Sequence, residues 1–257
     1  MTYSSAKPVI LVTHVPKCVG TSLRYALVRG LEIPNKKIYR PGFDGEKKIG
    51  SRGMLAIFFN HPSNFDYLIG HYPWGVHYTL RPWSKVARRP KIFIATLRDP
   101  IDQMVSYYYY HRQLRIDKGL SVCSNIKDLV QFYRQSTLAS NQQVRIYCGL
   151  PISFGNVWEH SRRIFGDEWL INKALNRLIL NYPFWVHHSF LNESVSNLGR
   201  ALDVKLTLGK AELTVTKDRP KTSDLSPEAI QELRSINSMD IKLHEALKPY
   251  LRRYCGL

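Results

Sequence analysis

The sequence lacks the long apolar runs of a membrane protein and the leader of a secreted one. No apolar run in its 257 residues approaches the ~20 residues that a membrane-spanning helix needs. Lys7 and Pro8 precede only a short apolar run at residues 9–12, and no small-residue cleavage site follows. We therefore expect neither a signal peptide nor a membrane segment, and a cytoplasmic chain is the first interpretation.

Cysteine is also scarce. The chain has four cysteines, which lie far apart and form no CxxC pair: Cys18, Cys123, Cys148 and Cys255. This spacing indicates neither a zinc site nor a dense disulfide framework. Free thiols are therefore expected, which suits a reducing compartment.

Acidic residues are few: 20 Asp and Glu stand against 37 Lys and Arg, for a formal net charge of +17. Such a surplus favours an anionic ligand, whether a polyphosphate, a nucleic acid or an acidic glycan, although basic surface can also serve solubility alone. A hydrophobic content of 44% and a charged content of 22% are ordinary for a globular protein. The length suits one α/β domain over residues 1–257.

Short apolar and β-branched runs have the pattern of strands that are buried on both faces of a parallel sheet. The expected strands are Val9–Thr13, 67–71, Lys91–Leu97 and Phe184–His187. The expected helices are 21–28, 54–59, 101–115, 126–138, 142–147, 169–180, one ending at 198, and a final long helix. Thr21 and Ser22 are predicted to cap the first helix, Asp99 with Pro100 to start the helix at 101, and Ser226 to cap the last. Strand, loop and helix in succession predict an α/β fold of three layers, with a central parallel sheet, flanking helices and a mostly helical second half.

The loop after the first strand reads HVPKCVGTSL, at residues 14–23. Lys17 lies inside this turn, and Thr21 and Ser22 bring hydroxyls to the helix start. Backbone N–H groups and the helix dipole favour a phosphate there, and the lysine adds a full charge. The loop is not a Walker A motif, because its lysine precedes the glycine and nothing is placed to hold the Mg²⁺ of a nucleotide. An ordinary loop with an exposed lysine remains the alternative.

This segment resembles the 5′-phosphosulfate loop HxPKTGGTSL of the sulfotransferases that use 3′-phosphoadenosine 5′-phosphosulfate (PAPS). The resemblance is closest to the carbohydrate group that includes the heparan sulfate 2-O-sulfotransferases and their bacterial relatives. The matching residues are His14, Pro16, Lys17, Gly20, Thr21, Ser22 and Leu23. Cys18 stands where Thr is usual and loses a hydroxyl donor while keeping its backbone N–H. Val19 stands where Gly is usual and excludes a left-handed backbone unless it is strained.

A second segment, LRDPIDQMVSYYY at residues 97–109, resembles the 3′-phosphate segment RDPxxRxxSxYxY of the same family. The resemblance implies that Arg98 and Ser106 hold the 3′-phosphate, for which the planar fork of an arginine is well suited. Gln103 replaces a usual Arg, so one positive charge is missing. Taken alone, Arg98 could equally be a cap or a surface ion pair, and the tyrosines at 107–110 are expected to pack.

Two further matches are partial. A Gly-His pair at a strand end supplies the catalytic base in relatives, and this implies that His71 takes the proton of the acceptor hydroxyl, with His77 in reserve. A late basic segment, TKDRP at 216–220, is similar to a loop that closes over the nucleotide, and a solvated turn is its alternative. Where relatives show Glu-Arg-Phe, this chain has His188-Ser189-Phe190. The sequence pattern indicates no particular role for the His187–His188 pair.

The resemblance implies a P-loop-like fold and in-line transfer of a sulfuryl group from PAPS to an acceptor hydroxyl, on a carbohydrate that can be acidic. His71 and Lys17 are the implied catalytic residues, Lys17 neutralising the departing phosphate. The implied cofactor-binding residues are Pro16, Lys17, Cys18, Val19, Gly20, Thr21, Ser22, Arg98, Ser106, Lys217 and Arg219. The desulfated product is adenosine 3′,5′-bisphosphate (PAP), and no metal is implied.

Other interpretations stay open at this point. A catalytically inactive basic protein of the same fold could bind an acidic glycan or a nucleotide, and the departures at Cys18, Val19 and Gln103 favour it. A nucleotide kinase is disfavoured by the missing Walker lysine–hydroxyl pair. No nucleic-acid partner is expected, because no motif for one is visible. A bacterial cytoplasmic protein is expected, and a Golgi-luminal enzyme without its anchor is the alternative.

Overall fold

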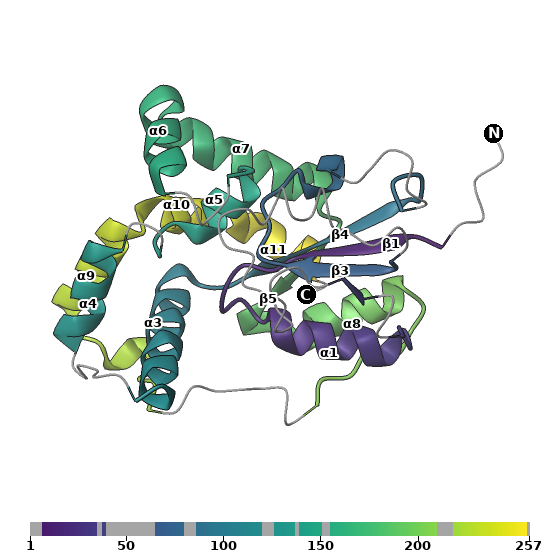
Figure 1. Ribbon diagram of the computed structural model, residues 1–257, viewed down its shortest axis with the longest axis horizontal. Coiled ribbons are helices and arrows are strands. Elements are labelled where there is room, and N and C mark those ends of the chain that lie inside the picture. Colours follow the sequence, from purple (N-terminus) through teal and green to yellow (C-terminus); the bar gives the residue numbers. More distant parts are fainter. Residues whose placement is uncertain are drawn as a thin grey trace.

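The computed structural model describes residues 7–34, 38–39, 65–79, 86–119, 126–136, 139–150, 155–209 and 218–255 (Figure 1). Its strands are β1 (Val9–Thr13), β2 (Ile38–Tyr39), β3 (Tyr67–Gly70), β4 (Lys91–Leu97) and β5 (Phe184–His187). They form one sheet in the order β2-β3-β1-β4-β5, and every neighbouring pair is parallel. The predicted parallel sheet is confirmed, with β3 one residue shorter than expected and β2 unforeseen.

The register aligns the carboxyl ends of the inner strands at one edge of the sheet. Thr13 lies opposite Gly70 on β3 and Ala95 on β4, and Leu97 lies opposite His187 on β5. The residues that follow these strands therefore gather at that edge, which we call the carboxyl edge. It carries the first loop at residues 14–19, His71, Arg98 and His188.

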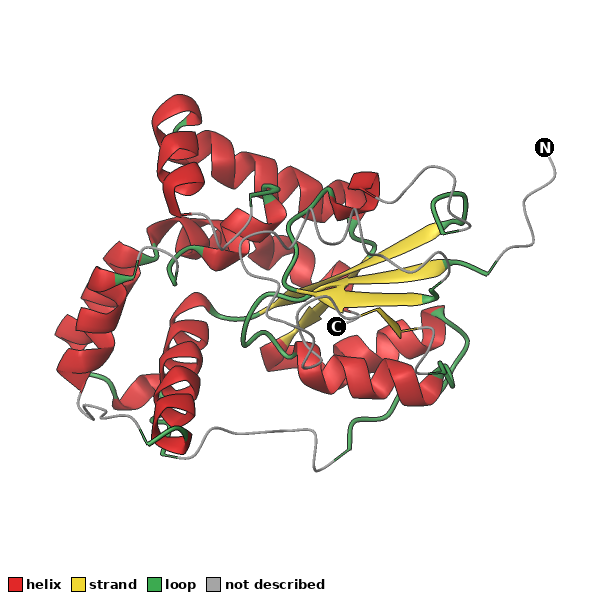
Figure 2. Ribbon diagram, in the orientation of Figure 1, coloured by secondary structure: helices red, strands yellow, loops and turns green. Residues whose placement is uncertain are grey.

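Helices cover both faces of the sheet (Figures 1 and 2). One face carries α1 (Gly20–Gly30) and α8 (Leu191–Ala201), and the other carries α5 (Gln142–Tyr147), α7 (Asp167–Asn181) and α10 (Ser238–Leu247). Alternate strand residues serve the two cores: Ile94 and Val186 belong to the core under α1 and α8, whereas Ala95 and Trp185 belong to the other. The prediction of a central parallel sheet between two layers of helices is therefore confirmed.

The second half is mostly helical, as predicted. Helices α3 (Pro100–Asp117), α4 (Ile126–Gln135) and α9 (Pro227–Ile236) share a further core beyond the carboxyl edge. The remaining helices are α6 (Gly155–Phe165) and α11 (Leu251–Cys255), with short 3₁₀ turns η2 (Val76–Thr79), η3 (His188–Phe190), η5 (Thr222–Asp224) and η6 (Lys248–Tyr250). Among the described residues, none of these helices combines the length and the apolar character needed to cross a bilayer.

Several local predictions need correction. The prediction of one final long helix is wrong: α9 ends at Ile236, and α10 and α11 are separate helices. The side chain of the C-cap residue Asn237 accepts a hydrogen bond from the backbone N–H of Asn141. Helix α6 was missed. The cap at Ser226 is confirmed, because its hydroxyl accepts from the Ala229 N–H at 3.2 Å. Residues 54–59 and Cys123 lie outside the described residues, and the three described cysteines are free and buried, as expected.

Candidate functional site

The strand order creates a crevice at the carboxyl edge. The chain leaves β1 through α1 toward β2 on one side of the sheet, and it leaves β4 toward β5 on the other side. Neighbouring strands whose connections diverge in this way form the topological switch point at which open α/β sheets bind ligands. The two phosphate-type segments that the sequence singled out follow β1 and β4, so both lie at this point.

The loop after β1 enters α1 through strained backbone. Lys17 and Val19 have positive φ angles of 63° and 51°. Val19 is the N-cap residue of α1, so Thr21 and Ser22 lie inside the helix and the prediction that they cap it is wrong. The left-handed conformation at Val19 is strained, because a β-branched residue strongly disfavours it. The side chain of Val19 cannot accept a hydrogen bond, so the N-cap residue of α1 does not provide the acceptor that Ser, Thr, Asp or Asn would provide there.

Gly20 is required by a close approach. A Cβ atom at this position would lie 2.0 Å from Cδ2 of His14, whose ring is buried against the start of α1. Thr21, one residue later, is exposed, and Ser22 is buried. The glycine of the motif thus lets the first residue of the loop fold back over the helix start.

His14 also orients His71. The carbonyl oxygen of His14 lies 2.6 Å from Nδ1 of His71, and the two rings lie 4.5 Å apart between their centroids. Since a carbonyl can only accept, Nδ1 of His71 carries the proton and the neutral ring presents Nε2 as its acceptor. Desolvation lowers the pKa of His71, which the contact with His14 partly opposes, while the residue keeps solvent exposure. His71 is therefore a neutral, accessible imidazole with a defined basic atom.

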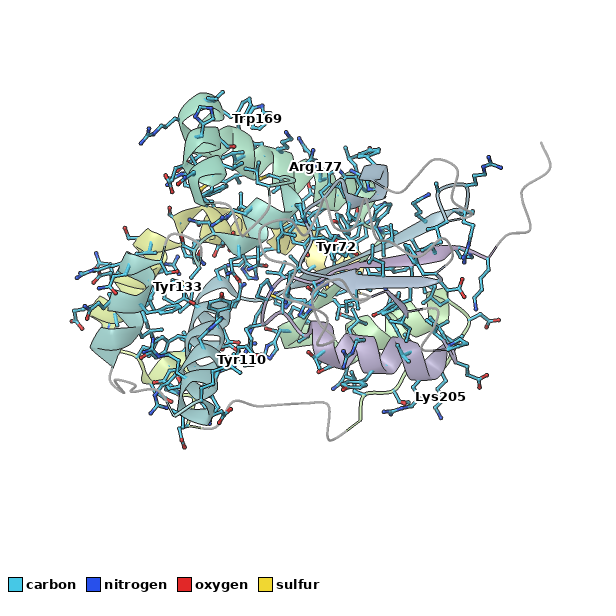
Figure 3. The ribbon with its side chains drawn as sticks, in the orientation of Figure 1. Tyr72, Tyr110, Tyr133, Trp169, Arg177 and Lys205 are labelled. Carbon is cyan, nitrogen blue, oxygen red and sulfur yellow. The ribbon has the colours of Figure 1, made fainter. Side chains whose placement is uncertain are left out.

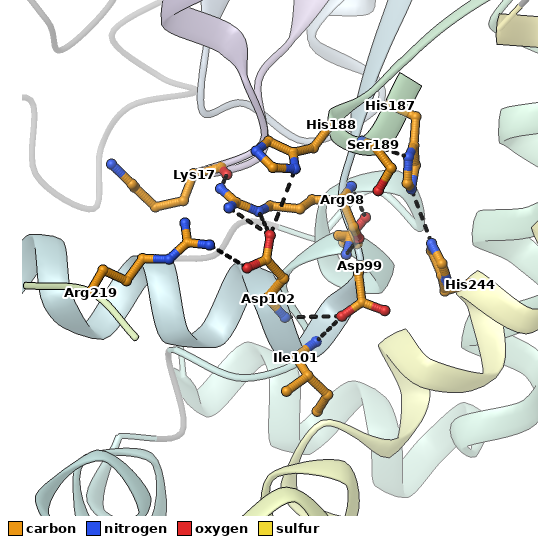
Figure 4. Close-up of polar contacts among 11 residues, drawn as sticks. Lys17, Arg98, Asp99, Ile101, Asp102, His187, His188, Ser189, Arg219 and His244 are labelled. Carbon is orange, nitrogen blue, oxygen red and sulfur yellow. Dashed lines mark hydrogen bonds and ion pairs between the residues drawn. The ribbon is translucent and has the colours of Figure 1, made fainter. Parts of the chain in front are cut away.

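Arg98 joins the two loops. Its guanidinium is buried, donating from Nη1 to the Lys17 carbonyl at 2.8 Å and from Nε to Oδ2 of Asp102 at 2.6 Å (Figure 4). Nη2 lies 2.6 Å from the same oxygen, so it is ion-paired with Asp102. The guanidinium is therefore held in a fixed orientation between the Lys17 carbonyl and the Asp102 carboxylate, where the loops after β1 and β4 meet.

Asp102 lies at the centre of the charged groups. Its carboxylate binds Arg219 as well as Arg98, and Oδ2 lies 3.7 Å from Nδ1 of His188 (Figure 4). The resemblance implies that Arg219, on the late basic segment, lies near a nucleotide; the structure pairs it with Asp102, with its side chain 18% exposed. Lys217 lies outside the described residues. Sequence reasoning assigned no role to Asp102 or His188, although both follow strands that end at the carboxyl edge.

Lys17 completes a crowded set of cations. Its Nζ lies 4.2 Å from the centroid of the ring of Tyr110, a residue of α3 that is labelled in Figure 3. Burial, followed by the charges of Arg98 and Arg219, lowers the pKa of Lys17 to about 8. Burial and the Arg98 charge also lower the pKa of His188 to about 4. Burial is the larger cause of both shifts, and the neighbouring arginine charges add to it, because Lys17, Arg98 and Arg219 lie close to one another.

Gln103 is buried within a network of amides. Its Nε2 donates to the Pro16 carbonyl at 3.0 Å, and its Oε1 accepts from Nε2 of Gln143 at 3.0 Å. Gln143 also donates to the Arg98 carbonyl at 2.9 Å. Gln103 thus fixes the loop after β1 to helix α3 without adding charge, where relatives of the resembled family carry an arginine. Ser106 is buried one helical turn beyond Asp102, and its contact with a phosphate stays a prediction.

Cys18 is a packing residue in the described conformation. It is buried, and its backbone N–H donates to the Val15 carbonyl at 3.0 Å. Burial raises the pKa of its thiol far above the ordinary value, so the sulfur stays protonated. The backbone N–H of Cys18 is thus engaged inside the loop. Phosphate binding by Cys18 stays a prediction, and Lys17 and the start of α1 are the other groups of this loop that favour an anion.

His77, the reserve base, packs among aromatic rings. Its ring lies 4.7 Å from Trp74 and 4.8 Å from Phe93, and burial lowers its pKa to about 4.

In the part of the chain that the structure describes, no group of three or more His, Cys, Asp or Glu side chains is arranged to hold a metal. Comparison with protein families finds no match for the chain, and comparison with curated proteins finds none.

Proposed function

We propose that the carboxyl edge binds PAPS and that the chain transfers the sulfuryl group to an acceptor hydroxyl, on a carbohydrate, within a P-loop-like fold. One observation carries the proposal: the buried guanidinium of Arg98 joins the two phosphate-type loops and lies close to the cations of Lys17 and Arg219. Phosphates and sulfates are the ligands that a buried arginine beside a lysine and a helix N-terminus favours.

Each part of the site has a matching part of the donor. Lys17 and the start of α1, whose N-cap residue is Val19, suit the 5′-phosphosulfate, because a lysine and a helix N-terminus both stabilise an anion. Arg98 and Arg219, with Ser106 and Lys217 as sequence predictions, suit the 3′-phosphate. The bound donor supplies an activated sulfuryl group, and Lys17 neutralises charge that grows on the leaving phosphate.

His71 is the proposed base. Its Nε2 can accept the proton of an acceptor hydroxyl, since Nδ1 is held by the His14 carbonyl. The lowered pKa keeps the imidazole neutral at physiological pH, so it needs no deprotonation before it acts. The acceptor's identity is inferred only from the resembled subgroup, and the surplus of basic residues suits a negatively charged one.

A catalytically inactive binding protein is the second candidate. The engaged N–H of Cys18 and the strained Val19 both remove features that a glycine-containing phosphate loop would offer. Such a protein would bind PAP or an acidic glycan at the same cations without turnover. This candidate predicts the same binding constants as the enzyme and differs only in catalysis.

Transfer from sulfur-labelled PAPS to a panel of desulfated glycans tests the proposal. Lys17→Ala should lower mainly kcat, Arg98→Ala should weaken mainly nucleotide binding, and His71→Ala should lower kcat by roughly 10²–10⁴-fold. The exposed His160 on α6 provides the matched histidine control. PAP binding without transfer to any acceptor would favour the binding protein, and absence of PAP binding would refute both. Stabilisation by ATP with Mg²⁺, but not by PAP, would favour a kinase.

A further inference from the structure

A second cavity, of about 770 Å³, opens beside the ends of β4 and β5. Its described lining includes none of Lys17, Arg98 and Arg219, the three cations of the proposed nucleotide site. The separation has a simple origin in the chain. Asp99 lines this cavity while Arg98 serves the first site, and His187 lines it while His188 lies beside Asp102 (Figure 4). A volume of this size is typical of small-molecule sites.

One wall of the cavity is a stripe of basic side chains. His244, Lys248 and Arg252 recur every fourth residue through α10, η6 and α11, so they share one face of this helical run. Lys248 is 2.6 Å from Glu245 and is thus partly neutralised. Arg252 is exposed and has no ion pair among the described residues. Because Lys248 is paired with Glu245, Arg252 is the cation of this stripe that is left to meet an anion in the cavity.

The other wall holds a directed chain of hydrogen bonds. The Ser189 N–H donates to Nδ1 of His187 at 3.2 Å, so a neutral His187 carries its proton on Nε2. That atom lies 3.1 Å from Nε2 of His244, which must then accept (Figure 4). His244 consequently carries its own proton on Nδ1. A neutral pair thus leaves His244 as a donor whose ring is held in place from the buried end.

Apolar side chains complete the lining. Phe190 comes from η3 and Leu251 from α11, on the two opposing walls. Asp99 is the only carboxylate among the described lining residues, and its Oδ1 already accepts the N–H groups of Ile101 and Asp102. A ligand that suits these groups has a flat apolar body, an acceptor for His244, and a negative group that meets Arg252.

We propose that this cavity binds a small organic anion with an apolar ring, its charged group at Arg252 and Lys248 and its ring between Phe190 and Leu251. The inference does not depend on the proposed function, because the two sites share no described cation. If the chain is a sulfotransferase, the cavity lies on the far side of Arg98 and Asp99 from Lys17 and is available while the donor is bound.

Calorimetry with naphthalene-2-sulfonate and its neutral analogue naphthalene-2-sulfonamide tests this site. The sulfonate should bind roughly tenfold more tightly or better, because its negative charge adds a charge-assisted contact that the neutral sulfonamide lacks. Arg252→Gln should remove that preference. Arg253→Gln should not, because Arg253 is exposed, lies over the Tyr254 ring and does not line the cavity.

A second variant guards against an indirect effect. Leu251→Trp should fill the cavity and abolish binding of the sulfonate while leaving PAP binding unchanged, and saturating PAP should not displace the sulfonate from the unmodified chain. Equal affinity for the two naphthalenes would overturn the proposal. So would sulfonate binding that survives both Arg252→Gln and Leu251→Trp, or complete displacement by PAP, which would make the cavity part of the nucleotide site.

Discussion

Helices α1 and α3 both begin at the carboxyl edge, directly after β1 and β4, but their first turns are built differently. At α3, Oδ1 of Asp99 accepts the N–H groups of Ile101 at 3.0 Å and of Asp102 at 2.9 Å, and Pro100 follows as the first helical residue. At α1, the N-cap is Val19 in a left-handed conformation, and its side chain makes no cap hydrogen bond.

The difference assigns the two ends separate tasks. The start of α3 is satisfied by its own chain, so an anion near it must be held by a side chain, and the buried Arg98 is placed for this. The start of α1 receives no such bond from its N-cap residue, its backbone is strained at Val19, and its dipole favours an anion directly. Two phosphate groups on one ligand would match these two kinds of site, one bound mainly by backbone and one mainly by guanidinium.

The largest expected effect breaks the start of α1. Gly20→Ala should lower the free energy of unfolding by about 3 kcal/mol, because the new methyl group would overlap the His14 ring at 2.0 Å. Urea denaturation measures this. In the double variant His14→Ala/Gly20→Ala the overlap is gone, so most of the loss due to Gly20→Ala should disappear. A stable single variant would show that the close approach of His14 is not a constraint.

The next effect is a pH dependence confined to the loop after β1. The protonated Lys17 binds an anion and its pKa is lowered to about 8, so affinity for PAP should be complete below that pH and fall above it. A loss of roughly tenfold by pH 10 is expected, since one charge-assisted contact is removed. Lys17→Arg should flatten the profile, because a guanidinium keeps its charge. An unmodified profile that is flat from pH 7 to 10 would contradict the assignment.

A smaller effect belongs to the start of α3. Asp99→Ala should lower the free energy of unfolding by about 1 kcal/mol through loss of the cap, and Asp99→Asn should retain most of the stability. Neither variant should change the preference for PAP over AMP, because Asp99 serves the helix and Arg98 serves the ligand. Loss of that preference without loss of stability would reverse the comparison between the two helix starts.

The smallest effect relieves the strain at Val19. Val19→Gly should raise the free energy of unfolding by up to about 1 kcal/mol, since a left-handed conformation costs an L-residue ~1–2 kcal/mol and the glycine loses some packing and entropy. Thermal unfolding measures the gain. A destabilised variant would mean that the packing of Val19 against the core under α1 outweighs the strain.

Much of the fold could be predicted because local patterns decide it. Apolar runs of strand length gave β1, β4 and β5 with correct bounds, and short-range capping chemistry gave Asp99 and Ser226. The final helix was wrong because its break at Asn237 depends on Asn141, a partner far away in the sequence. The cap at Thr21 or Ser22 was wrong because His14 folds over Gly20, which no local propensity describes.

The site was predictable as far as motifs reach. The contact between Arg98 and the Lys17 carbonyl follows from two motifs at adjacent strand ends, and Arg219 comes to the same place. Asp102 was missed because only the folded structure shows one carboxylate between two arginines. The motif indicates only that Gln103 lacks the charge of the usual arginine. In the structure, the buried Gln103 side chain donates a hydrogen bond to the Pro16 carbonyl and accepts one from Gln143.

The ratio of PAP affinity to AMP affinity, in the unmodified chain and in Arg98→Ala, tests the central claim that two differently built helix starts form one bisphosphate site. The unmodified chain should prefer PAP by roughly tenfold or more, and Arg98→Ala should bind both nucleotides equally. Arg234→Ala, at an exposed arginine on α9, is the matched control and should keep the preference. A chain that binds AMP and PAP equally, or an Arg98→Ala variant that keeps the preference, would contradict the account.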